Sequence, residues 1–596
     1  MRVGPLSRLW AAIASAADRR IGWQHFPALL GALLLGGLRV VLRQDNLYDT
    51  GVEPTTREPR PDPEDRRHLE ARTVDGAYND LSMPAMGSAG ARFGRNVPLD
   101  LTYTGGDQEI LSPNPRQVSR RLLARDRFRP ATSLNLLAAA WVQFMVHDWF
   151  SHGTNQRRDP FEVELEPDDP WPHRPMRIHR TRHDPTRPPD ASGPPTFANV
   201  VTAWWDGSQI YGSDEQTLAR VRGDRGELRV ENGLLPLDPK THQDATGVTG
   251  NWWLGLSLLH TLFSLEHNAI SGRLRSEYPG LSDDQVFDRA RLANAALIAK
   301  IHTLEWTPAI LANPALRIGM SSNWWGLLGR AARLRFGRIG RGDVLSGIPG
   351  SPTDHFGVPY SLTEEFVAVY RMHPLIPDDY SLRSHAGDGE LRRLTFPELA
   401  FGRARDVVEE LGLGDLLYSF GTANPGAITL HNFPQAMLEL RKPDGTLVDL
   451  AATDILRVRE RGVPRYNEFR KLMHKRPVAS FEELTGDPGT AEELRRVYGE
   501  VDRVDLMVGL YAEPVPPGFG FSDTAFRIFI LMASRRLNSD RFFTTDFRPD
   551  VYTPAGMQWV QETTFADVVR RHFPELGPSL EGVANPFAPW PVATGP

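Results

Sequence analysis

The segment SLNLLAAAWVQFMVHDWF (133–150) predicts a buried helix that carries one polar spot. Ser133 is the expected N-cap, and Gln143 and His147 lie one turn apart on an alanine-rich face. Asp148 is turned about 100° from His147 around the helix, so it must serve a different group. Taken alone, the segment favours a core histidine that is satisfied by the glutamine.

The composition is that of a large folded protein without thiol chemistry. The chain has 596 residues, of which 40% are hydrophobic and 24% charged, which argues against global disorder. It contains no cysteine, which excludes disulfides, thiolate nucleophiles and cysteine-ligated zinc or iron–sulfur clusters. The net charge of −6 carries no nucleic-acid signature.

Helical periodicity dominates the rest of the chain. Two proline-rich stretches, Val52–Arg72 and Arg157–Pro195, are expected to be irregular connections. We therefore predict a mainly α fold, a large single helical domain with few short strands. The further helical patterns lie at residues 250–275, 285–306, 362–373, 406–420 and 522–541.

The N-terminus combines apolar and basic residues. Residues 1–43 hold six arginines and one acid, and Phe26–Leu42 is almost wholly apolar. Seventeen residues with an internal arginine are marginal for a bilayer span. Two interpretations stay open, a segment in the lipid headgroup region and a helix buried against the body. A cleavable signal is disfavoured because its apolar stretch would be weak.

A second motif, SLTEEFVAVYRMHPLIPDDY (361–380), ends in a histidine beside a proline. Ser361 and Glu364 have the spacing of a capping box. Tyr370 and His373 follow on one stripe, and the next residue, a proline, ends or kinks the helix. Such a histidine could be an axial ligand with a phenol against the same cofactor, although a plain core pair is the more frequent arrangement.

A third motif, TAWWDGSQIYGS (202–213), is rich in oxygen donors. Side-chain hydroxyls, carboxylates and a backbone carbonyl are the ligands that Ca²⁺ prefers, and Asp148 offers one more carboxylate. Loops of this composition are common, so the motif alone is a weak signal. The alternating residues are Thr202, Trp204, Asp206 and Ser208.

A fourth motif, FRIFILMASRRLNSDRFF (526–543), predicts a buried helix with two arginines in its last turns. A buried guanidinium needs an anion, which makes one of Arg535 and Arg536 a candidate for a carboxylate-bearing substrate. The alternative is that they cap the helix end or face solvent.

Together these segments resemble the haem-dependent peroxidase–cyclooxygenase superfamily, and most closely its fatty-acid α-dioxygenase branch. WVQFMVHDWF is similar to the distal-histidine helix, VYRMHPLIPD to the proximal-histidine segment and TAWWDGSQIYG to the calcium loop. HTLFSLEHN and ILMASRRLNSDRFFTTDF are similar to further family blocks. The resemblance runs in one order from Trp23 to Phe573.

The resemblance implies a haem b site. In it His147 is the distal histidine, with Gln143 as its pocket partner, and His373 ligates the iron. Asn432, in LHNFP, is the expected partner of the other nitrogen of His373. Tyr370 matches the tyrosine whose radical does the chemistry.

The resemblance also implies a substrate anchor and a Ca²⁺ site. Arg536, His302 and Thr307 would bind the fatty-acid carboxylate. On an α-helix His302 and Thr307 would lie about 140° apart, so we expect the helix to break near Pro308. The implied Ca²⁺ ligands are Asp148, Thr202, Trp204 (through its carbonyl), Asp206 and Ser208.

One departure from the wider superfamily bears on the activity. True peroxidases of the group place a catalytic arginine, then a haem-linking glutamate and methionine, where this chain has Thr249, Trp252 and Trp253. This argues for non-covalent haem and against a general peroxidase.

The implied function is insertion of O₂ at the α carbon of fatty acids, giving 2-hydroperoxy acids, with a hydroperoxide as activator. We expect no nucleic-acid partner and a cytoplasmic or peripheral-membrane location. The implied organisation is an N-terminal segment that is a candidate membrane anchor (1–50), an irregular lead-in (51–130), the catalytic domain (131–575) and a C-terminal tail (576–596).

The sequence leaves three alternative functions. The first is a haem peroxidase that oxidises small substrates, and the second is a non-catalytic haem-binding protein of the membrane surface. The third is a non-haem metal hydrolase using His260, Glu266 and His267, which lack a recognised ligand spacing.

Overall fold

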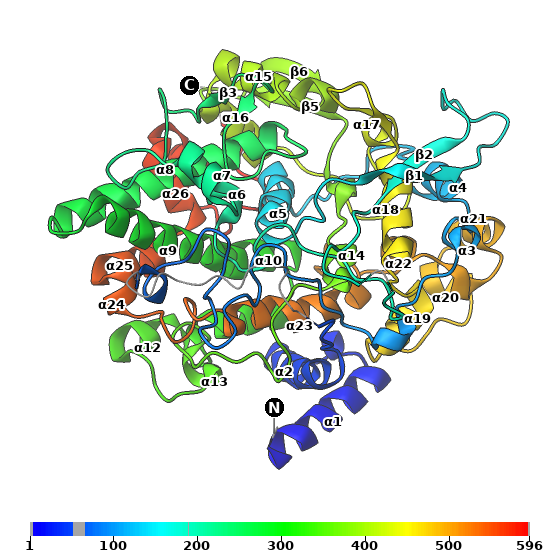
Figure 1. Ribbon diagram of the computed structural model, residues 1–596, viewed down its shortest axis with the longest axis horizontal. Helices are drawn as coiled ribbons and strands as arrows, with labels where there is room; N and C mark the ends of the chain where they lie inside the picture. Colours follow the sequence, from blue (N-terminus) through cyan, green and yellow to red (C-terminus); the bar gives the residue numbers. More distant parts are fainter. Residues whose placement is uncertain (1–3, 52–65, 189, 594–596) are drawn as a thin grey trace.

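Helices form most of the computed structural model, which describes residues 4–51, 66–188 and 190–593 (Figure 1). This confirms the mainly α prediction. The described helices of eight or more residues are α1 (Pro5–Arg20), α2 (Ala28–Asp45), α5 (Leu136–Trp149), α8 (Leu254–Glu277), α9 (Asp283–Ile301), α11 (Pro314–Trp325), α12 (Gly329–Phe336), α15 (Arg403–Leu411), α16 (Leu413–Thr422), α18 (Leu450–Glu460), α21 (Pro488–Tyr498), α23 (Asp523–Ser539), α25 (Pro554–Glu562) and α26 (Phe565–His572).

The strands of the described part of the chain form antiparallel two-stranded hairpins. The pairs are β1 (Gln156–Val163) with β2 (Met176–Arg180), β3 (Leu237–Asp238) with β4 (Gln243–Asp244), β5 (Asp379–Arg383) with β6 (Glu390–Thr395), and β7 (Leu440–Arg441) with β8 (Leu447–Val448).

The β1–β2 hairpin corrects the prediction that 157–195 is irregular throughout. Its first strand buries only Phe161 and Val163, so its sequence shows little of the alternation that marks a half-buried strand. Of the other predicted connection, Val52–Arg72, residues 52–65 lie outside the described residues, and Arg67–Leu69 forms a 3₁₀ turn.

Helix α5 lies in the centre of the molecule because it is apolar on nearly every side. It packs against α8 and α16, and α8 in turn packs against α9. Its N-cap is Asn135 rather than Ser133, since the Asn135 side chain accepts a hydrogen bond from the backbone N–H of Ala138 (3.2 Å). The same asparagine donates to the carbonyl of Pro586 (2.8 Å), which holds the C-terminal tail against α5.

Helix α14 (Glu364–Val369) is shorter than predicted and is capped differently. Thr363 accepts from the N–H of Phe366 (3.2 Å), and Glu364 turns away to bind His152 Nε2 (3.0 Å) instead of closing a box with Ser361. The helix ends before the 3₁₀ turn His373–Leu375.

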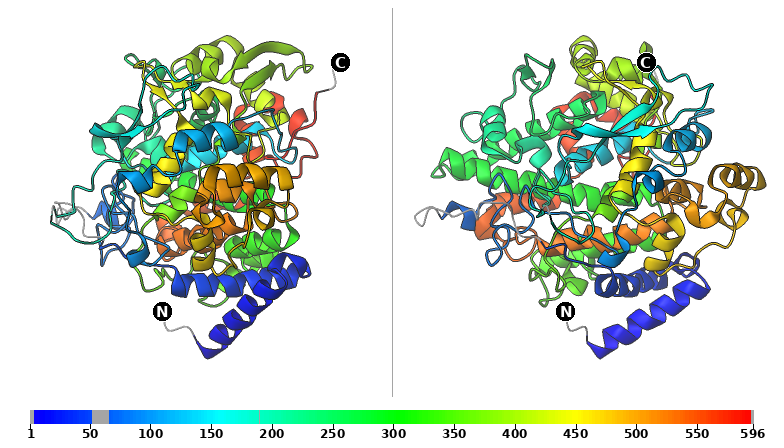
Figure 2. Two further views of the ribbon diagram at one scale, coloured as in Figure 1. Left: turned by 90° about the vertical axis from the view of Figure 1, so that its right-hand side faces the viewer. Right: turned by 45° about the vertical axis from the view of Figure 1, so that its right-hand side comes forward.

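The N-terminal helices α1 and α2 lie at one end of the molecule in all views (Figures 1 and 2). Helix α2 buries Leu34, Leu38 and Leu42 and packs on α11 and α23, while Leu29 and Leu33 stay exposed. In the described part of the chain, no helix combines the length and the apolarity that crossing a membrane requires.

Candidate active site

A cavity of about 1070 Å³ lies between the predicted proximal and distal segments. Gln143 of α5 and His373 both line it, although 230 residues separate them in sequence (373 − 143 = 230). Trp252 and Trp253 also line its wall; they occupy the positions that the resemblance gives to haem-linking residues. Neither indole can form an ester or sulfonium link, so the cavity suits a large cofactor held without covalent bonds.

The axial candidate His373 has an acidic partner that sequence reasoning missed. Nδ1 of His373 lies 2.8 Å from Oδ2 of Asp454, which is buried in α18; this close contact lacks the alignment of a hydrogen bond. Although burial opposes ionisation, Arg371 and His373 hold the pKa of Asp454 below its usual value. This leaves Nε2 of His373 for a metal, and the negative partner would strengthen the imidazole as a ligand.

Asn432 does not take that role, which corrects the prediction. Its side-chain oxygen accepts from Nε of Arg125 (3.0 Å) and from the backbone N–H of Arg129 (3.1 Å). Its amide donates to the carbonyls of Arg129 (2.9 Å) and Ala427 (2.7 Å). Asn432 therefore holds a loop in place. The sequence feature that indicates the true partner of His373 is Asp454, an acid inside the apolar run DLAATDILRV.

The distal candidates lie one turn apart on α5, as predicted. Gln143 accepts from Nε1 of Trp253 (2.7 Å) and donates to the carbonyl of Asn251 (3.2 Å), so it positions the cavity wall. His147 is buried, with its ring centroid 6.4 Å from that of His260, and its Nδ1 has no hydrogen-bond partner. Burial lowers the pKa of His147 to about 4, so near neutral pH the ring is uncharged and can accept a proton.

Arg536 is a buried cation without an anion in this structure. It is 2% exposed, and its Nε and Nη2 have no hydrogen-bond partner. The guanidinium carbon lies 3.8 Å from the ring centre of Trp149 and 4.4 Å from that of Trp205, and the Nε1 atoms of both indoles also lack partners. Burial lowers the pKa of Arg536, so an anionic ligand would relieve the cost of this charge.

The neighbouring Arg535 is bound to the protein through Nη2, although its Nε has no hydrogen-bond partner. Its Nη2 donates to the carbonyls of Val358 (2.8 Å) and Pro359 (2.9 Å). Arg536 has two buried nitrogens without a partner and Arg535 has one, so Arg536 is the better candidate to bind a ligand.

His302 and Thr307 line one cavity of about 350 Å³, but not for the predicted reason. The helix does not break at Pro308; instead His302–Trp306 forms a π-helical turn. Because a π-turn bonds residue i to i+5, it stacks side chains five apart, and Thr307 Oγ1 donates to the carbonyl of His302 (2.8 Å). Sequence periodicity of 3.6 could not reveal this extra residue.

The protonation state of His302 follows from its neighbours. Nε1 of Trp141 donates to Nδ1 of His302 (3.2 Å), so the remaining proton sits on Nε2. Burial and the charge of Arg536 hold the pKa of His302 well below its usual value. The neutral ring thus offers one N–H donor, which suits a carboxylate oxygen.

Tyr370 lies beside this anchor. Its ring stacks on Phe529 (centroids 4.5 Å apart), which lines the same cavity as His302, and it meets the edge of Trp149 at 5.2 Å. The indole of Trp149 also contacts His302 (5.4 Å) and Arg536. Burial raises the pKa of Tyr370 far above its usual value, so the phenol keeps its proton.

The predicted Ca²⁺ ligands converge at the end of α5. The N–H of Ser208 donates to Asp148 Oδ1 (2.6 Å) and to Asp206 Oδ1 (3.1 Å). Asp148 Oδ2 and Thr202 Oγ1 are buried and have no partner. Burial and the charge of Asp206 raise the pKa of Asp148 to about 8, which indicates a place where a cation would neutralise two close carboxylates.

Within the described residues no cluster of three or more acidic or histidine side chains is placed to hold a metal, so hydroxyl and carbonyl oxygens would complete this site.

The hydrolase alternative does not fit the structure. The carboxylate of Glu266 forms hydrogen bonds with Arg571 (2.6 Å), His572 (2.8 Å) and Nε1 of Trp559. His267 contacts the hydroxyl of Tyr211 (2.9 Å) instead of joining a ligand set.

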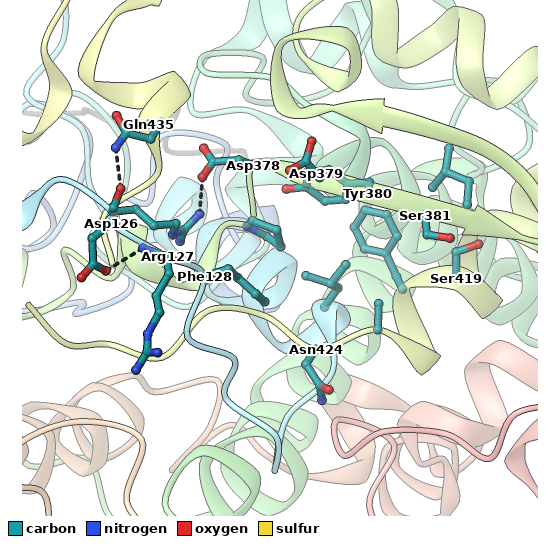
Figure 3. A pocket seen from close by; sticks show the side chains of 16 residues that line it. Asp126, Arg127, Phe128, Asp378, Asp379, Tyr380, Ser381, Ser419, Asn424 and Gln435 are labelled. Atoms are coloured by element: carbon teal, nitrogen blue, oxygen red, sulfur yellow. Dashed lines mark hydrogen bonds and ion pairs between the residues drawn. The ribbon is translucent and has the colours of Figure 1, made fainter. Parts of the chain in front are cut away.

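A third cavity, of about 330 Å³, lies apart from all predicted residues (Figure 3). Tyr380, Ser419 and Asn424 line it, and Asp378 at its edge accepts from Nη1 of Arg125 (2.8 Å). Its buried charges are already paired, so it has no demand for a charged ligand.

Comparison with known proteins identifies the family of the chain. The sequence profile described as animal haem peroxidase matches residues 71–582. Alpha-dioxygenase PIOX of Oryza sativa subsp. japonica is 38% identical over 96% of this chain and 94% of its own length. Alpha-dioxygenase 2 of Arabidopsis thaliana is 41% identical over 97% and 92%.

The fold is also similar to that of solved structures. A tyrosine-to-phenylalanine variant of the Oryza sativa fatty acid alpha-dioxygenase, solved with palmitic acid, superposes with a TM-score of 0.90 at 36% identity, covering 99% of this chain and 98% of that one. The Arabidopsis thaliana fatty acid alpha-dioxygenase gives a TM-score of 0.91 at 35% identity, covering 100% and 94%.

Proposed function

The chain belongs to the animal haem peroxidase family and to its alpha-dioxygenases, and on that premise we propose that it is an oxidoreductase that adds O₂ to the α carbon of fatty acids. One observation supports this most directly. A single indole, that of Trp149, contacts both the unpaired cation Arg536 and the phenol Tyr370.

The anchor explains the choice of carbon. Arg536 would bind the carboxylate with its free N–H groups, and Nε2–H of His302 would bind the same group. A carboxylate held by Arg536 beside Trp149 would place the adjacent carbon near Tyr370, which contacts the same indole, while later carbons would extend along the 350 Å³ cavity.

Once the oxygen of Tyr370 is a radical, this residue alone can take up and return the hydrogen atom that the reaction moves. The phenoxyl oxygen takes a hydrogen atom from the α carbon, and the carbon radical adds O₂. The resulting peroxyl radical takes the hydrogen atom back, which yields a 2-hydroperoxy acid and restores the tyrosyl radical. The buried, unionised phenol is suited to this exchange because a hydrogen atom, and no net charge, is transferred.

We propose that the 1070 Å³ cavity would hold haem b, with His373 as the residue that would bind the iron and Asp454 beside the other ring nitrogen. Bound haem supplies the one-electron oxidation that starts the cycle when a hydroperoxide activates it. His147, neutral near pH 7, would carry the proton of that hydroperoxide, and Gln143 keeps Trp253 in place.

The function is tested by adding palmitic acid to the haem-loaded protein and following O₂ uptake with product mass analysis. We expect a 2-hydroperoxy acid, or the one-carbon-shorter aldehyde that forms on its decarboxylation. Guaiacol oxidation without O₂ uptake from palmitic acid would assign the protein to the peroxidases instead.

We also propose that Ca²⁺ binds at Asp148, Thr202, Asp206, Ser208 and the carbonyl of Trp204, because Asp148 Oδ2 and Thr202 Oγ1 are buried without a partner and the N–H of Ser208 binds both Asp148 and Asp206. Trp204 fits this role through its backbone, since its Nε1 is engaged by the carbonyl of Gly76 (2.8 Å).

Removal of Ca²⁺ is expected to lower the melting temperature by more at pH 8 than at pH 5. In the cation-free protein the pKa of Asp148 is about 8, above the 3.8 of a free aspartate, so its contribution to stability falls as pH rises through this interval. Saturating Ca²⁺ should restore about 2.7 kcal/mol at 100-fold excess over Kd. Calorimetry with and without EDTA measures the shift; Asp148→Asn is the control that should abolish it, and a pH-independent shift would contradict the assignment.

We further propose a peripheral-membrane location, for which the surface around α1 and α2 is the basis.

A further inference from the structure

The 350 Å³ cavity opens toward one end of the molecule. Its inner part is lined by His302, Thr307 and Phe529. Its outer part is lined by Leu29 and Leu33 of α2 together with Leu327 and Val344. Helix α11 joins these parts, because it packs against α2, α12 and α13 (Asp343–Ser346). The mouth of the cavity therefore lies between the α1–α2 pair and the segment Leu327–Leu345.

This mouth is surrounded by large apolar side chains in contact with solvent. Figure 1 places α1, α2, α12 and α13 at the same end of the molecule, and both views of Figure 2 keep α1 and α2 there. A soluble surface rarely gathers so many exposed apolar side chains without a partner. The members of this entrance surface are Leu9, Ile13, Ile21, Leu29, Leu30, Leu33, Leu327, Leu328, Leu334, Phe336, Ile339, Val344 and Leu345, each at least 38% exposed.

The charge around these residues is strongly positive. Leu327–Leu345 contains five arginines and one acid, Asp343. Two of the arginines, Arg333 and Arg338, donate to nearby carbonyls and hold the segment together. The exposed arginines at this end are Arg8, Arg19, Arg20, Arg330, Arg335 and Arg341.

We propose that the entrance surface docks on an anionic lipid bilayer, so that fatty acids pass from the membrane into the 350 Å³ cavity without crossing water. Apolar side chains would enter the boundary between headgroups and acyl chains, and the arginines would contact anionic headgroups. The charge favours a lipid surface over a second copy of this chain, because two such faces would repel each other.

The arrangement of helices α1 and α2 fits docking on a membrane surface and not crossing of the membrane. Helix α1 exposes Leu9 and Ile13 on one side and buries Ala11 and Ala14 on the other, as an interfacial helix does. Helix α2 is fixed to the body, since Nη2 of Arg43 donates to Ser534 Oγ of α23 (2.8 Å). The proposal rests on the proposed function only for the identity of the fatty acid; the docking itself is independent of haem and O₂.

Vesicle co-sedimentation of the full-length protein tests the docking. Vesicles of phosphatidylcholine with 30% phosphatidylglycerol, a composition chosen to be about as anionic as a cytoplasmic leaflet, are compared with pure phosphatidylcholine. The combined variant Leu9→Ser, Ile13→Ser, Leu334→Ser, Phe336→Ser avoids every residue that lines the cavity. It should weaken binding to the anionic vesicles roughly tenfold or more. Arg330→Gln and Arg335→Gln should each weaken it roughly fivefold.

A matched control removes exposed apolar residues from other parts of the surface. Leu101→Ser with Leu391→Ser, both 42% exposed, should leave vesicle binding unchanged. Equal loss of binding in this control, no binding by the unmodified protein, or equal binding to both vesicle types would overturn the proposal. So would a dimer in sedimentation velocity that the fourfold variant dissociates, since the surface would then bind a second copy.

Oxygen uptake from palmitic acid dispersed in detergent separates this proposal from the function. The fourfold variant should retain that activity, because its residues lie outside the cavity, and lose activity only on vesicle-borne substrate. If both substrates support equal rates in the variant, the docking proposal fails while the proposed reaction stands.

Discussion

Tyr370→Phe is expected to abolish O₂ uptake from palmitic acid, with a fall of roughly a thousandfold or more, while the haem absorption band stays unchanged. The substitution removes only the oxygen that exchanges hydrogen with the α carbon. The ring contacts with Phe529, Phe366 and Trp149 are made by carbon atoms and remain. Initial rates with an oxygen electrode and the absorption spectrum of the same sample give both readouts.

Tyr380→Phe is the matched control. Tyr380 is also buried and its hydroxyl lacks a partner, but it lines the 330 Å³ cavity and not the cavity of His302 and Thr307. It should retain near-normal activity. Substantial α-oxygenation by Tyr370→Phe would rule out the tyrosyl mechanism, and equal losses in both variants would point to a structural effect.

Arg536→Ala is expected to raise the KM for palmitic acid roughly 30-fold or more. Truncation of one partner in a buried charge pair costs about 2–5 kcal/mol, and here the lost partner is the carboxylate anchor. The free protein should not lose stability, because the guanidinium is buried without an anion until substrate binds. Steady-state kinetics and thermal melting without fatty acid measure the two effects.

Arg535→Ala should show the opposite pattern. Its loss leaves two backbone carbonyls, those of Val358 and Pro359, without their donor, which costs about 1–3 kcal/mol of folding free energy. The KM of molecules that remain folded should change little. If Arg535→Ala raises the KM more than Arg536→Ala does, the anchor has been assigned to the wrong arginine.

Local sequence patterns predicted much of the site because they reflect local constraints. The spacing of Gln143 and His147 places both on one turn of α5, as predicted. The proline after His373 does not end α14, which already ends at Val369; it lies in the 3₁₀ turn that follows. The proposed Ca²⁺ ligands could be selected from sequence because alternate oxygen donors around a glycine turn are visible in one short loop.

The errors concern partners that are distant in sequence. Asp454 lies 81 residues beyond His373 (454 − 373 = 81), and only the packing of α18 against the cavity selects it over Asn432. Ser361 was replaced as a cap by Thr363 because Glu364 had a better partner in His152. In each case tertiary contact decided between residues that local rules rank alike.

The π-turn at His302–Trp306 has a consequence for engineering. If the same residues formed a regular α-helix, which is the more favourable local geometry, Thr307 would lie about 140° from His302 around the helix. Substitutions that favour a regular α-helix in this turn are therefore expected to raise the melting temperature and lose the substrate together. Directed evolution for stability alone would be expected to select against the very irregularity that lets two residues five apart serve one carboxylate.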